Sequence, residues 1–150
     1  MTKKIYYQDK NVKVFVDTNI LHNYCTKQPD DVACMEYLFG VRTKSKLLTS
    51  TLAVGQTLSH YKKNRIKEAV AMGKFLLSKM TFISFTEEDI VKSFREDGND
   101  IEDNMHYVCS QKSNTKCGIV VSNDKTGFEG KAHIVVVKSK RLSVLKTLIS

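Results

Sequence analysis

Short apolar runs alternate along this chain with longer stretches that carry helical signals. The run from Val12 to Asp17 is rich in β-branched residues and predicts a buried strand. Comparable runs follow at residues 47–48, 81–85, 118–121 and 134–137. Strands that are separated by helices favour a parallel sheet, because a parallel connection has to cross back over the sheet. The alternation therefore predicts an α/β fold with a central, mostly parallel sheet.

Capping signals indicate where the helices begin. Ser50 and its two threonine neighbours can cap a helix that runs to about residue 63. Thr86 precedes a run of acids, which stabilise the positive end of a short helix. The remaining helices are expected after Asp17 to about residue 24, and over residues 32–44, 65–79, 100–114 and 142–149.

Length and composition bound the class of protein. At 150 residues the chain has the usual size of one domain, so we expect a single domain over residues 1–150. The apolar runs are far too short for a membrane span, and the first residues lack the apolar core of a signal peptide, so a cytoplasmic protein is expected. The four cysteines have no metal-binding or redox spacing, which favours reduced thiols in or near the core.

The net charge of +8 is unevenly distributed along the chain. Basic residues dominate residues 42–79 and 112–150, whereas acids dominate residues 80–111. Basic surface attracts nucleic acid, because phosphate contacts release counterions. Acidic residues close to a bound phosphate would repel it unless a cation offsets their charge. The alternative is a basic protein whose acids form a solvated helix start.

Three acids fall where α/β folds place their chemistry. Asp17 and Asp124 each follow a predicted strand, and ligands of open parallel sheets bind beyond the carboxyl ends of strands. Asp103 lies in the first turn of a predicted helix. If the three converge, their mutual repulsion requires a cation, and a set of carboxylates suits Mg²⁺ or Mn²⁺. His106 lies on the same helix face as Asp103 and could support this site.

Each acid also has a structural interpretation. Asp17 could cap the next helix, Asp103 could complement the helix dipole, and Asp124 could belong to a turn. Asp100 is better explained as an N-cap than as a metal ligand, since Asp-x-x-Asp resembles a capping box. Glu102 is expected to face solvent or to support the site.

Four segments resemble the PIN domain, a small α/β nuclease fold of bacterial toxin ribonucleases and RNA-processing proteins. They are residues 14–21 (VFVDTNIL), 48–56 (LTSTLAVGQ), 100–107 (DIEDNMHY) and 119–124 (IVVSND), followed by Phe128, in family order. The resemblance implies a three-layer α/β/α domain that hydrolyses RNA with Mg²⁺ or Mn²⁺. It places the metal-binding and catalytic acids at Asp17, Asp103 and Asp124, with Asn19 and Ser50 in support. It also implies the toxin of a toxin–antitoxin pair, whose partner is an antitoxin protein.

Gln56 departs from the family pattern, which usually has a glutamate at the corresponding position. An amide oxygen can coordinate a hard cation but supplies no charge, so metal affinity should fall. This motivates the alternative of a non-catalytic PIN-like module that binds RNA or a protein. Gln56 could also be a surface residue, and Glu68 is the next acid along the chain.

Two basic clusters could contact RNA backbone. The first comprises Lys62, Lys63 and Arg65, and the second comprises Lys138, Lys140 and Arg141. Solvated lysines are the alternative. The sequence leaves the oligomeric state open, with a homodimer among the arrangements considered.

A phosphatase that uses Asp17 as its nucleophile is disfavoured by Asn19, where that class needs an acid. A nucleotide-binding Rossmann module is disfavoured because no glycine-rich loop follows the first strand.

Overall fold

The computed structural model describes residues 11–97, 100–112, 117–124, 128, 131 and 133–149. Within them lies one five-stranded sheet in which every paired neighbour is parallel. The order is β3-β2-β1-β4-β5. The strands are β1 (Val14–Val16), β2 (Leu47–Ser50), β3 (Thr81–Ile83), β4 (Ile119–Val121) and β5 (Val135–Val137). The prediction of a parallel α/β sheet is confirmed.

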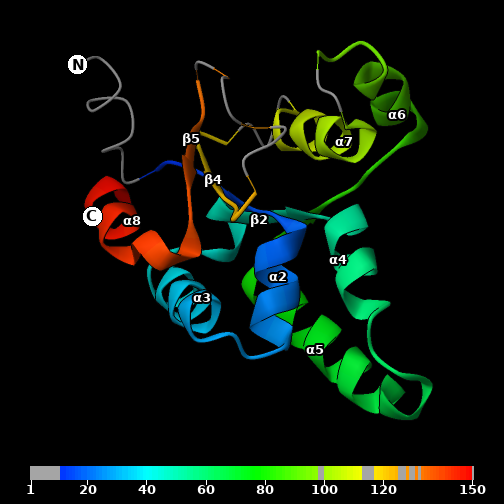
Figure 1. The fold of residues 1–150 in the computed structure, drawn as a ribbon, viewed down its shortest axis with the longest axis vertical. Coiled ribbons are helices and arrows are strands. Elements are labelled where there is room, and N and C mark those ends of the chain that lie inside the picture. The colour runs from blue at the N-terminus through cyan, green and yellow to red at the C-terminus, as the bar shows by residue number, and fades with distance from the viewer. Residues whose placement is uncertain are drawn as a thin grey trace.

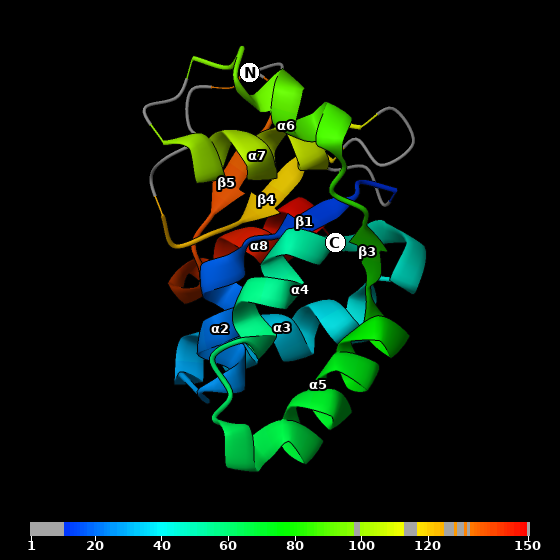
Figure 2. The same cartoon turned by 90° about the vertical axis from the view of Figure 1, so that its right-hand side faces the viewer.

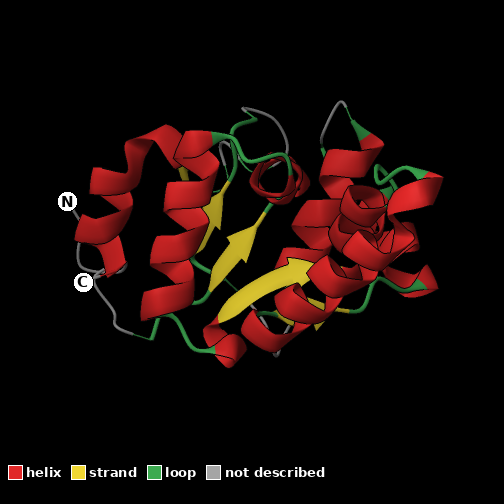
Figure 3. Cartoon of the chain, turned by 90° about the horizontal axis from the view of Figure 1, so that it is seen from below, coloured by secondary structure: helices red, strands yellow, loops and turns green. Residues whose placement is uncertain are grey.

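Helices cover both faces of this sheet, as Figures 1 and 2 show. The helices are α2 (Thr18–Cys25), α3 (Pro29–Val41), α4 (Thr51–Leu58), α5 (Ile66–Lys79), α6 (Glu87–Ser93), α7 (Ile101–Ser110) and α8 (Leu142–Ile149). Figure 3 shows the strands between the two helical layers. The three-layer α/β/α arrangement is therefore confirmed. None of the described helices is both long and apolar enough to cross a membrane.

The sheet divides the core in two because successive side chains of a strand point to opposite faces. Val14 and Val16 pack with α2, α3, α4, α5 and α8. Phe15, on the other face, packs with Cys109 of α7 and with Phe128, whose ring centroid lies 5.9 Å away. Both halves are buried, which explains why the strands are continuous apolar runs rather than alternating ones.

Several element ends differ from the predictions. Helix α4 ends at Leu58 rather than near residue 63, because the chain turns there into a short 3-10 helix, η2 (Lys63–Arg65). Helix α3 begins at Pro29, where a helix start was expected because proline at the first helical position needs no N–H partner, but it ends at Val41 rather than near residue 44. Helix α7 ends at Ser110 rather than near residue 114, and residues 113–116 lie outside the described part of the chain. The predicted caps at Ser50, Thr86 and Asp100 are confirmed.

Candidate functional site

Asp17 lies at the carboxyl end of the central strand β1 and is only 6% exposed. Its Oδ1 accepts a hydrogen bond from the Thr18 N–H (2.8 Å), which caps α2. Its Oδ2 accepts from the Ser122 hydroxyl (2.7 Å) and from the Asn19 amide (3.3 Å). Asp17 therefore caps α2 and also contacts the polar residue Ser122, which directly follows β4. A role as a helix cap does not exclude a role of this acid in a site.

Asp124 is brought to Asp17 by the pairing of their strands. Val16 lies opposite Val121 in the parallel register, so both chains leave the sheet at the same edge. Asn19 bridges the two acids, because its amide nitrogen lies 3.3 Å from Asp17 Oδ2 and 3.4 Å from Asp124 Oδ2. The Asp124 N–H in turn donates to Ser122 Oγ (3.1 Å). The structure thus joins Asp17, Asn19 and Asp124 in one polar network.

Asn123 fixes this network to the rest of the fold. Its N–H donates to Asn19 Oδ1 (3.1 Å), and its side-chain amide donates to Asp31 Oδ1 (3.0 Å). Its Oδ1 accepts from the Ser139 N–H (3.0 Å) and hydroxyl (3.1 Å). Asp31 was not among the predicted site residues, because an acid just after Pro29 looks like an ordinary helix start. The buried position of Asp31, 4% exposed, is visible only in the fold.

A second polar chain reaches the same edge from α4 and α7. The Thr18 hydroxyl donates to Gln56 Oε1 (3.1 Å) and lies 3.2 Å from His106 Nε2. His106 is 2% exposed, and Glu102 Oε1 lies 3.8 Å from its Nε2. Gln56 is thus a partly buried residue rather than a fully exposed one. It faces the residue that follows Asp17.

Asp103 lies in the first turn of α7 and is partly buried. Its N–H and that of Glu102 donate to Asp100 Oδ1, so Asp100 is an N-cap. His106, one turn later on the same face, contacts Thr18, so this face of α7 is turned toward α2. Ser50 is fully buried, and its hydroxyl accepts from the Ala53 N–H (2.9 Å) to cap α4.

The side chains at this edge of the sheet offer carboxylate and amide oxygens, which are the ligand types that a hard divalent cation prefers. Within the described residues, however, no three His, Cys, Asp or Glu side chains form a group that could hold a metal ion. The Asn19 amide bridges Asp17 and Asp124, and Gln56 adds an uncharged oxygen beside Thr18. Two carboxylates and a neutral oxygen fit Mg²⁺, which proteins usually bind through one or two carboxylates.

The two basic clusters lie in different places. Lys138 directly follows β5, and Ser139 contacts Asn123, so the cluster of Lys138, Lys140 and Arg141 adjoins the acid network. Lys62, Lys63 and Arg65 lie exposed around η2, at the end of α5 that is remote from the sheet in Figure 2. Arg65 pairs with Glu68, so Glu68 is engaged away from the site.

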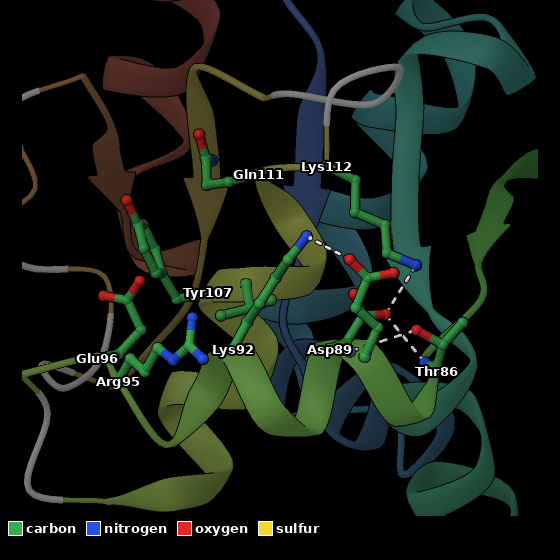
Figure 4. A pocket seen from close by; sticks show the side chains of 10 residues that line it. Thr86, Asp89, Lys92, Arg95, Glu96, Tyr107, Gln111 and Lys112 are labelled. Atoms are coloured by element: carbon green, nitrogen blue, oxygen red, sulfur yellow. Dashed lines mark hydrogen bonds and ion pairs between the residues drawn. The ribbon is translucent and has the colours of Figure 1, made fainter.

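A cavity of about 620 Å³ lies between α6 and α7, and none of the predicted site residues lines it (Figure 4). Its wall includes the buried Asp89, whose Oδ2 accepts from Lys112 Nζ (2.7 Å) and from the Thr86 N–H (2.9 Å). Burial alone would raise the pKa of Asp89, but these hydrogen bonds outweigh burial and lower it. Two ion pairs therefore lie in this wall, Asp89 with Lys112 and Glu88 with Lys92.

Comparison with known proteins supports the fold. The architecture is consistent with a three-layer α/β/α PIN-like fold. Among solved structures, the chain is similar to the crystal structure of VapBC2 from Rickettsia felis bound to a DNA fragment from their promoter, with a TM-score of 0.57 and 16% sequence identity. The alignment covers 83% of this chain and 97% of that chain. No protein-family model and no curated protein matches the sequence.

Proposed function

We propose that this protein is a divalent-metal-dependent endoribonuclease of the PIN type. The observation that carries the proposal is the network in which Asn19 and Ser122 hold Asp17 and Asp124 at one edge of the sheet. This edge, beyond the carboxyl ends of β1 and β4, is where parallel α/β folds bind their ligands. In this proposal the enzyme acts on RNA in the cytoplasm.

Asp17, Asp103 and Asp124 would hold Mg²⁺ or Mn²⁺, with Gln56 as a neutral oxygen donor. Such a cation, when bound, lowers the pKa of a water molecule and offsets charge that develops on the phosphate. The Thr18 N–H and the Ser122 hydroxyl fix the orientation of the Asp17 carboxylate before any ligand arrives. Lys138, Lys140 and Arg141 would contact the RNA backbone, since they lie next to this edge.

Replacement of Asp17 by asparagine tests the proposal. A purified protein should cleave single-stranded RNA with Mg²⁺ or Mn²⁺, leave 5′-phosphate and 3′-hydroxyl ends, and lose activity with a chelator. Asp17→Asn should abolish cleavage, whereas Ser143→Ala, on an exposed position of α8, should leave it unchanged. Cleavage that survives in Asp17→Asn would exclude this site as the source of the activity.

A second candidate function is that of a non-catalytic PIN-like module that binds RNA or a protein. It is favoured by Gln56 and by the lack of a three-acid group among the described residues. This function predicts RNA retention in the presence of a chelator and no cleavage under any metal condition. Gln56→Glu distinguishes the two, because restoring the charge should tighten Mn²⁺ binding, measured by calorimetry, only if a cation binds here.

The similar structure is a VapBC2 assembly, which motivates a proposal about partners. We propose that this chain acts as a toxin and is neutralised by an antitoxin protein. Expression of the active chain should arrest growth of a host cell, and Asp17→Asn should relieve the arrest. Arrest of equal strength by the Asp17→Asn variant would contradict the toxin function. Size-exclusion chromatography with light scattering would show whether the chain alone forms the homodimer considered above.

A further inference from the structure

The Thr18 hydroxyl has one hydrogen and two partners. It lies 3.1 Å from Gln56 Oε1 and 3.2 Å from His106 Nε2. An amide oxygen can only accept, so Thr18 must donate its hydrogen to Gln56. Thr18 can then only accept from His106, which requires a hydrogen on Nε2. Because a neutral imidazole carries one hydrogen, Nδ1 of His106 is left as a bare acceptor.

The opposite orientation of the Gln56 amide reverses every step. If its NH₂ group faced Thr18, the hydroxyl would accept from Gln56 and donate to His106 Nε2. The hydrogen of His106 would then be on Nδ1. The tautomer of His106 therefore reports which end of the Gln56 amide faces Thr18.

The surroundings of His106 favour the first arrangement. Its ring is 2% exposed, and Nδ1 has no hydrogen-bond partner within the part of the chain that the structure describes. Glu102 Oε1, 3.8 Å from Nε2, is beyond hydrogen-bond distance, but its negative charge favours a hydrogen on the nitrogen nearest to it. A buried polar atom that lacks a partner is unfavourable and calls for an explanation. A bare Nδ1 fits this unpartnered position better than an N–H does, because buried donors without a partner are rarer than buried acceptors without one.

We propose that Thr18 and His106 are positioning residues that hold the oxygen of the Gln56 amide toward the helix start at Asp17. This inference rests on the proposed function: Gln56 would offer a divalent cation a neutral oxygen in place of a carboxylate. Without these hydrogen bonds the amide could also rest with its NH₂ group toward the helix start, and it would have to rotate before binding a cation. The hydrogen-bond chain from His106 through Thr18 removes that orientation.

The tautomer can be measured without metal or RNA. Long-range ¹H–¹⁵N NMR spectra of the full ¹⁵N-labelled chain distinguish the protonated from the bare imidazole nitrogen, and His106→Asn assigns the signal. We expect His106 to carry its hydrogen on Nε2. A hydrogen on Nδ1 would overturn the proposal, because it would place the Gln56 NH₂ group against Thr18. A doubly protonated ring would also overturn it, since Nδ1 would no longer be an acceptor.

A double-mutant cycle tests whether Thr18 acts through Gln56. Thr18→Val keeps the shape and the backbone N–H that Asp17 caps, but loses the hydroxyl. We expect Thr18→Val to weaken Mn²⁺ binding about fivefold by calorimetry, and Thr18→Ser to stay near wild type. In a Gln56→Ala background, Thr18→Val should change the affinity less than about twofold.

The outcomes separate this proposal from the proposed function. Equal losses of Mn²⁺ affinity on Thr18→Val in both backgrounds would assign Thr18 a structural role and refute the positioning. If the wild-type chain binds no Mn²⁺ at all, the metal-dependent function and the ligand role of Gln56 both fail. The NMR experiment would still decide whether His106 and Thr18 orient the amide.

Discussion

Replacing Ser122 with alanine should destabilise the protein through the carboxylate of Asp17. The Ser122 side chain is fully buried, and its hydroxyl donates to Asp17 Oδ2 at 2.7 Å. A hydrogen bond to a charged group contributes about 1.5–3 kcal/mol, and its loss leaves Oδ2 with the longer bond from Asn19 at 3.3 Å. The Asp124 N–H also loses its acceptor, but Asp124 is exposed and water can replace it. We therefore expect a loss of about 2 kcal/mol in the free energy of unfolding.

Urea denaturation followed by circular dichroism measures this change without any metal or RNA. The midpoint should fall with an unchanged slope, and the melting temperature should fall by about 4–8 °C. Ser143→Ala is the matched control, because Ser143 is exposed on α8, and it should stay within about 0.5 kcal/mol of wild type. A Ser122→Ala variant as stable as this control would refute the view that Ser122 holds a buried, charged Asp17.

Three further predictions concern other parts of the molecule. Lys112→Met should lower stability by about 2 kcal/mol at pH 7, because it removes a hydrogen bond to the buried Asp89. The pKa of Asp89 is lowered in the folded state, so its stabilisation is present above the unfolded value of about 3.9 and is lost as the pH falls through the folded pKa. Urea denaturation at several pH values should thus show the variant and wild type converging below about pH 4, and a constant gap would contradict the charge assignment. In the native protein, a thiol reagent at pH 8 should modify Cys25 alone and slowly, because burial raises the pKa of the other three thiols, those of Cys34, Cys109 and Cys117, to about 12. Rapid labelling of several thiols before denaturation would disprove this burial. Finally, the double substitution Lys140→Gln and Arg141→Gln, made in the Asp17→Asn background, should weaken RNA binding in fluorescence anisotropy titrations. The slope of the binding constant against salt concentration should fall by about two ion contacts. An unchanged slope would exclude these side chains from the RNA interface.

The sequence predicted the elements of this fold well, because their signals are local. A strand needs only a short β-branched run, and a helix start needs only a capping side chain, as at Thr86 and Asp100. The position of Asp17 after a buried strand also sufficed to select it as a candidate ligand. Helix ends were predicted less well: α4 ends at Leu58, where a turn and η2 interrupt a sequence that has no strong stop signal.

The partners of each site residue were decided by the tertiary structure alone. The strand order places β1 between β2 and β4, and this order brings Ser122 and Asp124 beside Asp17 across more than 100 positions of chain. Periodicity and capping report how a segment folds and which face it buries, but they carry no information about which segment lies next to it. The amino-acid sequence by itself therefore determined the alternating elements and the acids at their ends. Packing decided that His106 and Gln56 meet at Thr18, because such contacts exist only once the helices have docked on the sheet.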